Sequence, residues 1–487
     1  MHSLDLLELG AAAPEAIAVV SDGGHELTYG ELRALVAEYR AALARPAKAL
    51  VLIDGPRTVT GLVGYLAALS AGHAVVLVED GGARAAAEVI AGYAPDLVVT
   101  HEESQLGGLL DRLGFRRRPA ARLPTWDGIA DQAAPPVHEA LGLLARTSGS
   151  LGPPKAVRIS YASLRANALA IAEALGLRVS DRTMTSLPLD FSFGLSLLNS
   201  AFAAGGAVAL TRHAPSSRQF WTLLDRVTGT CAGAVTSTYR FLRSTGWDPA
   251  CHPSVRLLLQ AGGPIDKETA GYCRSRLARH GGEFILMYGQ TEATARIAYL
   301  PTALARAHEC AAGIPVPGSR VTIEAAAGVP ATDGTVGEII VRGPGVMLGY
   351  AQGRADLSAG DKHGGVLRTG DLGYVRNGCL YVTGRADRQV KVFGRRVDLD
   401  RLESQLMEHG VTAAAEAPDD EHIALLFEPA ASELDLRREI AARLGLPAPA
   451  IRLVTAALPR TASGKIDRGA VRRLLCDAAG QAPGRRA

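Results

Sequence analysis

The fold is decided by one stretch, Leu143-Leu144-Ala145-Arg146-Thr147-Ser148-Gly149-Ser150-Leu151-Gly152-Pro153-Pro154-Lys155-Ala156-Val157. An apolar run precedes its polar centre and a strand-like run follows it, so two sheet strands are expected to hold a loop between them. Glycines let backbone approach an anion, hydroxyls donate hydrogen bonds and a lysine supplies charge. The groups suited to a phosphate are Thr147, Ser148, Gly149, Ser150 and Lys155. Taken alone, a Ser/Gly surface turn explains the loop equally well.

The loop is not a Walker A motif. That motif needs Gly-Lys-Ser/Thr opening a helix, with the hydroxyl on magnesium. Here Pro153 and Pro154 precede Lys155 and an alanine follows it. A phosphotransferase, which the Gly-rich loop alone would suggest, is therefore disfavoured.

Whole-chain properties exclude several classes of protein. At 487 residues the chain exceeds what one hydrophobic core usually serves, so at least two domains are expected. The net charge of +3, without a basic stripe among aromatics, predicts no nucleic-acid partner. No leader-like start and no uncharged apolar run of about 18 residues is evident, which predicts a cytoplasmic protein with no membrane partner. Six scattered cysteines without a Cys-x-x-Cys pair favour reduced thiols over zinc or disulfides.

Strand-like and helix-like segments alternate in the first part of the chain. A Thr-x-x-Glu capping box at Thr28 predicts a helix that continues to about Leu43. Strands are predicted over residues 49–53, 74–78 and 97–99, and helices over 59–69 and 83–91. This alternation predicts a parallel sheet. Residues 112–136 lose periodicity and are predicted to form a long surface connection.

The second part continues the same pattern and then changes. Helices are predicted over residues 164–175 and 220–227, and strands over 207–210, 255–259 and 284–287. Near Gly313 short alternating strands begin, as in residues 319–324 and 337–342, which predicts a mainly β subdomain. The tail from Gly480 is predicted to be disordered.

A second polar motif follows the buried strand that ends near Met287. Thr291 and Glu292 are expected at the carboxyl end of that strand, where open α/β sheets place their sites. A carboxylate beside a polyphosphate loop implies Mg²⁺. A solvated loop end is the alternative for a lone Thr-Glu pair.

Three further motifs lie towards the C-terminus. Asp371 sits in a glycine turn, suited to accepting both hydroxyls of a ribose or simply closing a turn. Residues 384–397 are dense in charge between two glycines, as expected of a solvated segment or of a domain joint. Lys465 lies on a second Ser-Gly turn, far away in sequence.

In this order and spacing the five motifs resemble the adenylate-forming superfamily, which comprises acyl-CoA synthetases, standalone adenylation domains and luciferases. The resemblance covers nearly the whole chain. It implies an α/β fold with a large N-terminal domain of two α/β subdomains and a β subdomain over residues 1–386. It also implies a hinge at Asp387, a small mobile α+β cap over 387–476 and a disordered tail over 477–487.

The resemblance also implies roles for individual residues. The mobile phosphate loop corresponds to Thr147, Ser148, Gly149, Ser150 and Lys155, and the turn along adenine to Gly262, Gly263 and Pro264. Tyr288 would stack on the base, Thr291 would hold the α-phosphate and Glu292 would serve magnesium. Asp371 corresponds to the ribose carboxylate and Arg385 to its basic companion. Lys465 would bridge the acid's carboxylate and the α-phosphate.

The acid pocket is expected to contain Phe191, Gly194, Met287 and Arg296. Gly194 stands where amino-acid-activating relatives often carry an aspartate for the substrate's ammonium, with Asp190 one turn away. A buried ammonium without a carboxylate is costly, which predicts an acid without an α-amino group. Arg296 could meet a second polar group of the acid, although a salt-bridged wall residue is its commoner role.

The predicted function is an ATP-dependent carboxylic acid ligase. A small carboxylic acid and Mg-ATP would give acyl-AMP, and a thiol, preferably CoA, would then displace AMP. A phosphopantetheinyl acyl carrier protein is the alternative acceptor, and an amide synthetase is a third possibility. A non-catalytic nucleotide-binding protein is the alternative from another class, but the presence of both Lys465 and Glu292 argues against it.

Overall fold

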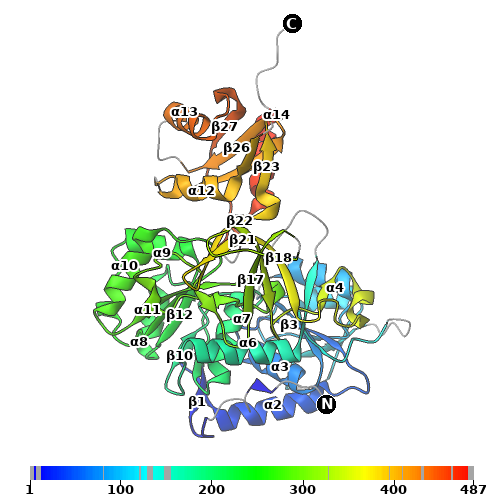
Figure 1. Ribbon diagram of the computed structural model, residues 1–487. Helices are drawn as coiled ribbons and strands as arrows, with labels where there is room; N and C mark the ends of the chain where they lie inside the picture. The colour runs from blue at the N-terminus through cyan, green and yellow to red at the C-terminus, as the bar shows by residue number, and fades with distance from the viewer. Residues whose placement is uncertain are drawn as a thin grey trace.

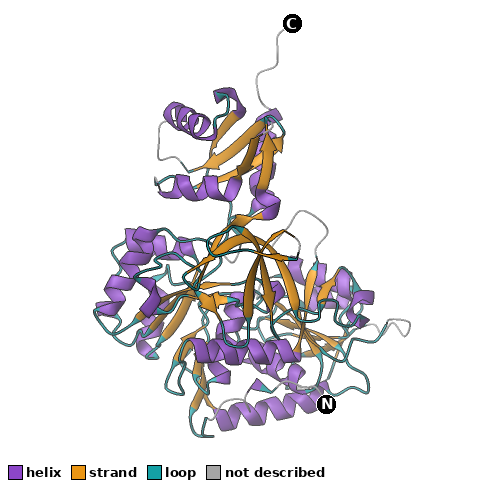
Figure 2. Cartoon of the chain, viewed as in Figure 1, coloured by secondary structure: helices purple, strands orange, loops and turns teal. Residues whose placement is uncertain are grey.

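The computed structural model describes residues 5–6, 12–79, 82–119, 122–128, 135–146, 155–326, 328–393, 395–408, 410–428, 433–461 and 464–480. The fold is mixed α/β, as predicted, with a large N-terminal part and a smaller C-terminal part (Figure 1). Strands run through the centre of each part and helices cover them (Figure 2). No helix within these described ranges is long and apolar enough to cross a membrane.

The first sheet has eight strands. In spatial order they are β20 (Gly349–Ala351), β9 (Ala156–Ser160), β8 (Leu141–Arg146), β4 (Ala74–Val78), β3 (Leu50–Asp54), β5 (Leu97–Val99), β7 (Thr125–Asp127) and β6 (Arg116–Arg117). The neighbours from β8 to β5 pair in parallel, which confirms the predicted parallel sheet. The long surface connection predicted over 112–136 contains two short strands, because β7 pairs with β5 and β6 pairs with β7 at the sheet edge. These strands are too short to give a periodic signal.

The second sheet has nine strands. In spatial order they are β16 (Ile314–Pro315), β15 (Ala298–Tyr299), β14 (Glu283–Tyr288), β13 (Leu257–Gln260), β12 (Cys231–Ala234), β10 (Arg182–Met184), β11 (Ala207–Ala209), β1 (Ile17–Val20) and β2 (Glu26–Thr28). The strands from β14 to β1 are parallel to one another. Their carboxyl ends therefore meet at one edge, where site residues are expected.

Helices cover both faces of each sheet. They are α2 (Tyr29–Leu43), α3 (Val59–Ser70), α4 (Ala83–Tyr93), α5 (Gly107–Arg112), α6 (Tyr161–Ala174), α7 (Ser192–Ala203), α8 (Arg218–Arg226), α9 (Thr236–Ser244), α10 (Lys267–Ala278) and α11 (Thr302–Ala305). The predicted capping box is present, with the Thr28 side chain accepting from Glu31 N–H. The largest core cluster joins β3, β4 and β11 through α2, α3, α6 and α7, so these helices lie between the two sheets.

A five-stranded antiparallel sheet forms the predicted β subdomain. Its order is β18 (Val329–Pro330), β17 (Arg320–Ala326), β19 (Gly337–Arg342), β21 (Val366–Arg376) and β22 (Cys379–Arg385). Register places Asp371 on β21 opposite Arg385 on β22. Two predicted site residues are thus neighbours because of strand pairing alone.

The C-terminal part has its own apolar core. It contains β23 (Gln389–Val392), β24 (Arg395–Asp398), α12 (Leu399–Glu408), β25 (Ala413–Asp419), β26 (His422–Phe427), α13 (Glu433–Leu444), β27 (Ile451–Thr455) and α14 (Arg468–Gly480). It stands next to β21 and β22 of the larger part (Figure 1). The tail predicted over 477–487 begins too early, because α14 remains helical to Gly480. Residues 481–487 lie outside the described ranges.

Candidate active site

The predicted phosphate loop is held by two antiparallel strands, β8 and β9, whose last pair is Arg146 and Ala156. Thr147, Ser148, Gly149 and Ser150 lie outside the described residues. Lys155 is described, and its ammonium lies 4.2 Å from the centre of the Tyr350 ring.

Tyr350 connects two of the predicted motifs. Its hydroxyl donates to Glu292 Oε1 at 2.8 Å, while its ring faces Lys155. Tyr350 reaches this place because β20 pairs with β9, opposite Val157. Its own sequence neighbourhood does not indicate this position, since only the register of two distant strands brings Tyr350 to the candidate site.

A tight turn presents Thr291 and Glu292 directly after β14. They lie in the short 3₁₀ helix η2 (Thr291–Ala293), and the next residue, Thr294, has a φ of 55°. A Cβ at Gly289 would lie 1.7 Å from the Ala295 carbonyl oxygen, so only glycine fits there. Thr291 Oγ1 lies 3.2 Å from Ser192 Oγ, a second contact that the sequence did not reveal. Strained backbone of this kind is typical of functional sites.

The turn predicted to lie along adenine follows β13, the neighbour of β14. Gly262 has a φ of 88°, which favours glycine. Two side-chain hydrogen bonds hold the turn in place. Gln260 Nε2 donates to the Gly263 carbonyl at 2.8 Å. Thr236 Oγ1 donates to the Pro264 carbonyl at 2.9 Å. The predicted turn and the Thr291–Glu292 segment therefore share one sheet edge.

Tyr288, Asp371 and Arg385 form a connected group. The Tyr288 hydroxyl donates to Asp371 Oδ2 at 2.5 Å, and an Arg385 nitrogen lies 3.6 Å from Asp371 Oδ1. Burial raises the pKa of Asp371 above its usual range, although the Tyr288 hydrogen bond and the Arg385 charge oppose that shift. The hydroxyl contact holds the Tyr288 ring in place; its stacking on adenine stays a prediction.

Lys465 of the C-terminal part reaches into the larger part. Its ammonium lies 4.7 Å from the centre of the Phe191 ring, and a Cβ at Gly262 would lie 3.1 Å from its Cε. The supporting turn is closed by Thr461 N–H, which donates to the Lys465 carbonyl at 2.8 Å. Burial lowers the pKa of Lys465, and the Arg296 charge adds to this effect, whereas Glu292 and Asp371 oppose it. The structure thus brings a lysine distant in sequence to the predicted site.

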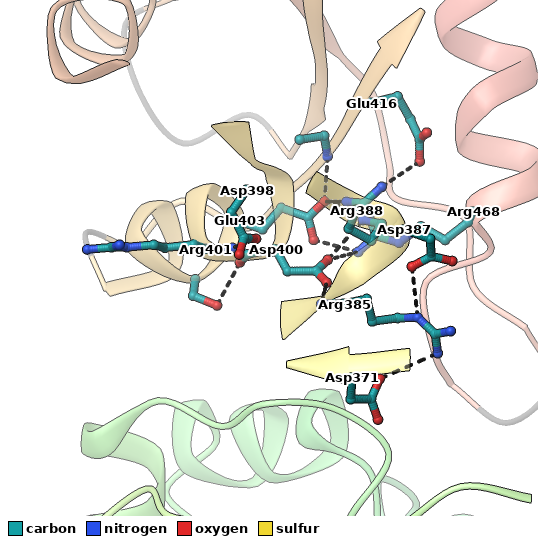
Figure 3. Close-up of polar contacts among 12 residues, drawn as sticks. Asp371, Arg385, Asp387, Arg388, Asp398, Asp400, Arg401, Glu403, Glu416 and Arg468 are labelled. Carbon is teal, nitrogen blue, oxygen red and sulfur yellow. Dashed lines mark hydrogen bonds and ion pairs between the residues drawn. The ribbon is translucent and has the colours of Figure 1, made fainter. Parts of the chain in front are cut away.

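Arginines on both sides of the predicted hinge, Arg385 and Arg388, form ion pairs with carboxylates (Figure 3). Arg385 lies between Asp371 and Asp387. Beyond the hinge, Arg388 contacts three carboxylates of the C-terminal part: Asp400 at 2.9 Å, Glu403 at 2.6 Å and Glu416 at 3.0 Å. Asp387 stands between these two anchors with 71% of its side chain exposed.

Three of the four residues expected in the acid pocket lie together in the structure, and their role in binding the acid stays a prediction. Phe191, Met287 and Arg296 lie together around Phe193, which was not predicted: the two phenylalanine rings meet edge-on at 6.2 Å, and Arg296 Nε lies 3.3 Å from Met287 Sδ. Gly194 does not offer a side-chain position there. A Cβ on it would lie 2.1 Å from the Pro188 carbonyl oxygen, so the residue instead allows α7 to pack on that turn.

Asp190 pairs with Arg146, which is not a residue of this pocket. The two side chains lie 3.9 Å apart, and burial followed by the nearby Glu79 charge raises the pKa of Asp190 to about 6. The commoner salt-bridged role of Arg296 is also wrong for the described part of the chain, where it forms no ion pair. Its environment is instead aromatic.

The chain is similar to several known proteins. A sulfoacetate–CoA ligase of Cupriavidus necator is 31% identical over 71% of this chain and 69% of that protein. A probable non-canonical nonribosomal peptide synthetase of Salinispora arenicola is 30% identical over 95% of this chain, which spans 6% of that protein.

A solved o-succinylbenzoate CoA synthetase of Bacillus subtilis, in complex with its acyl-adenylate intermediate, has the same fold. Its TM-score is 0.74 at 23% identity, with 97% of this chain and 98% of that chain covered. The family model of the AMP-binding enzymes matches residues 8–351, more than half of the chain. The protein therefore belongs to the AMP-binding enzyme family.

Proposed function

We propose that this protein is an ATP-dependent acid–thiol ligase that forms an acyl-AMP and then an acyl thioester, with CoA as the acceptor. One observation carries the proposal: Lys465 of the C-terminal part lies against Phe191 and Gly262, at the sheet edge that also presents Glu292. Family membership and relatives named as CoA ligases or synthetases support it.

In the first step a carboxylate oxygen of the acid attacks the α-phosphorus of ATP. The bond from that phosphorus to the bridging oxygen of pyrophosphate breaks, and pyrophosphate leaves. Two anions repel each other, so cations and oriented donors must offset both the repulsion and the charge on the phosphoryl oxygens. We assign this task to Lys465, with Thr291 as a donor to the α-phosphate and Lys155 as a cation beside the phosphate loop.

Glu292 fits a hydrated Mg²⁺ that arrives with ATP. Magnesium usually takes one or two protein carboxylates together with phosphates and water, and the described residues hold no group of three or more His, Cys, Asp or Glu side chains that would form a protein cage. When bound, the ion neutralises charge on the phosphates. Tyr350 keeps the Glu292 carboxylate in place by donating to its Oε1.

In the second step the thiol sulfur attacks the acyl carbon. The bond between that carbon and the AMP oxygen breaks, the thiol gives up its proton, and AMP leaves. A free thiol acceptor fits a reducing compartment such as the cytoplasm, as do the free thiols of Cys231, Cys251, Cys273, Cys310 and Cys379.

The test is a panel of carboxylic acids assayed for acid-dependent exchange of labelled pyrophosphate into ATP. Exchange that requires both acid and Mg²⁺, followed by AMP release on addition of CoA, is the expected outcome. Tight ATP binding without exchange for any acid would instead indicate a non-catalytic nucleotide-binding protein.

A further inference from the structure

Arg296 is a buried cation that lacks a counter-ion in the described structure. Its exposed fraction is 3%, and no ion pair joins it to a carboxylate of the described residues. Its Nη2 is buried without a hydrogen-bond partner there, and Nε meets only the soft sulfur of Met287 at 3.3 Å. The guanidinium carbon stands 3.8 Å from the centre of the Phe193 ring.

A buried and unpaired charge of this kind lowers the free energy of unfolding of the protein. A buried charge normally needs a paired charge or full hydrogen bonding. Burial lowers the pKa of Arg296 to about 9, so the side chain still carries its charge near neutral pH. The Phe193 ring compensates part of the lost hydration, because a cation is attracted to an aromatic face. The ring does not accept hydrogen bonds from the guanidinium N–H groups, and these groups therefore remain available to an anion.

The position of Arg296 indicates where that anion comes from. The Phe193 and Phe191 rings pack edge-on with their centres 6.2 Å apart. The Lys465 ammonium lies 4.7 Å from the centre of the Phe191 ring. The two cations thus lie over neighbouring rings of one aromatic pair. The two positive charges repel each other, and the Arg296 charge contributes to the lowered pKa of Lys465. Under the proposed function Lys465 takes the reacting carboxylate, and Arg296 is the second cation of the same pocket.

We propose that the acid substrate carries a second anionic group, a carboxylate or a sulfonate, and that Arg296 binds it. A planar guanidinium can donate two parallel hydrogen bonds to either group, and such charge-assisted pairs are strong. The proposal rests on the proposed ligase function. It also predicts that an α-amino acid is a poor substrate, since an ammonium near Arg296 would be repelled.

The experiment compares acids of equal chain length that end in a methyl, a carboxylate or a sulfonate group. We expect kcat/KM for pyrophosphate exchange to be at least tenfold higher for one of the two anionic series than for the methyl series. The anionic acids should also raise the melting temperature of the ATP-bound protein more than the methyl-terminated ones. The comparison of carboxylate with sulfonate decides which anion is the natural one.

Variants locate the effect. Arg296→Met should abolish the preference by raising KM for the anionic acids at least tenfold more than for the methyl-terminated ones, and Arg296→Lys should restore part of it. The matched control is Arg274→Met, which removes another partly buried arginine with unsatisfied nitrogens, on helix α10. It should leave the preference unchanged.

Other outcomes contradict the proposal. Equal kcat/KM for all three series in the wild type would overturn it and leave the ligase function intact. An undiminished preference in Arg296→Met, or an equal loss for every acid through kcat alone, would make Arg296 a support for Phe193 and Lys465. Absence of exchange with every acid would contradict the ligase function as well.

Discussion

At the scale of single residues, Lys465 is expected to separate the two half-reactions. Lys465→Ala removes the charge that offsets repulsion between the acid and the α-phosphate. Loss of one such group typically costs about 10²–10³ in rate, so acyl-AMP formation should fall by at least that factor. Conversion of supplied acyl-AMP to thioester should persist. Pyrophosphate exchange measures the first rate, and single-turnover thioester formation measures the second.

The matched control is Arg443→Ala, which removes an exposed cation of the same C-terminal part. It should leave both rates unchanged. An exchange rate for Lys465→Ala equal to that of the control would remove Lys465 from the site.

Asp190 makes a pH-dependent contribution to stability. Its pKa is about 6 when folded, because of burial and then the Glu79 charge, which Arg146 and Arg57 partly offset; its ordinary value is 3.8. Between these values the folded protein binds more protons than the unfolded chain, so this contribution to the free energy of unfolding decreases as pH rises. The full loss is about 3 kcal/mol, at 1.36 kcal/mol per pKa unit.

Asp190→Asn removes this titration. Relative to wild type, we expect the variant to gain about 2 kcal/mol more at pH 7.5 than at pH 4.5, since most of the loss develops above pH 4.5. Urea denaturation at both pH values measures the difference, with the exposed Glu103→Gln as control. The same stability change at both pH values would show that Asp190 is not held at a raised pKa.

Local motifs allowed Glu292, Asp371 and Lys465 to be predicted, because each carries its chemistry within a few neighbouring residues. Tyr350 and Phe193 could not be predicted in this way. Tyr350 acquires its role from the pairing of β20 with β9, and Phe193 from its position opposite Arg296. Nothing in their own sequence neighbourhoods distinguishes them from ordinary core residues.

At the scale of elements, η4 (Ala386–Arg388) connects β22 of the larger part to β23 of the C-terminal part, and Asp387 is its exposed central residue. If rotation occurs there, fixing φ with Asp387→Pro should slow thioester formation at least tenfold while leaving adenylation nearly intact. Separate assays of the two half-reactions give the ratio. Equal loss of both rates in a folded protein would show that Asp387 is not the pivot.

Arg388→Ala changes another residue of η4 and is expected to affect the two half-reactions differently from Asp387→Pro. Removing this arginine leaves Glu403 and Glu416 buried with fewer partners, at a cost of about 1–3 kcal/mol to the C-terminal part, since Arg468 still pairs with Glu403 and Arg472 with Glu416. Because it damages the anchor and not the pivot, it should lower both rates together. Thermal denaturation should then show an earlier transition for the C-terminal part.

The alternation of strands and helices predicted the apolar strands β3, β4, β5, β11, β13 and β14 of the two large sheets, but not β1, β10 or β12. Buried parallel strands are continuous apolar runs bounded by turns, and their crossover helices have helical periodicity. The edge strands β6 and β7 escaped prediction because two or three residues give no period. The extension of α14 to Gly480 escaped it because Ala478 and Ala479, good helix formers, resemble a low-complexity tail when viewed by composition.

At the scale of the whole molecule, both parts contribute residues to the proposed site. The larger part supplies Glu292, Asp371 and the Gly262 turn, and the smaller part supplies Lys465. Composition could not predict this arrangement, since it depends on how one folded part is placed on another. The resemblance of the five motifs was needed to anticipate it.

The acceptor is also decided at this scale, and we expect CoA to be preferred over a pantetheinylated carrier protein by at least tenfold in kcat/KM. CoA brings three phosphates and needs several cations to bind them, whereas a carrier brings an acidic helix and needs a broad basic and apolar patch. Arg388 is already occupied by three carboxylates, so the basic patch around the hinge is smaller than the sequence suggests. A small group of cations suits phosphates better than a protein surface.

The assay supplies the acid, Mg-ATP and one of three acceptors: CoA, pantetheine or a pantetheinylated carrier. If cations recognise the CoA phosphates, pantetheine should react at least tenfold less efficiently than CoA, a difference of about 1.4 kcal/mol in transition-state stabilisation. The advantage of CoA over pantetheine should shrink as salt is raised, because exposed charges are screened. A tenfold preference for the carrier would instead assign this enzyme to carrier-protein loading.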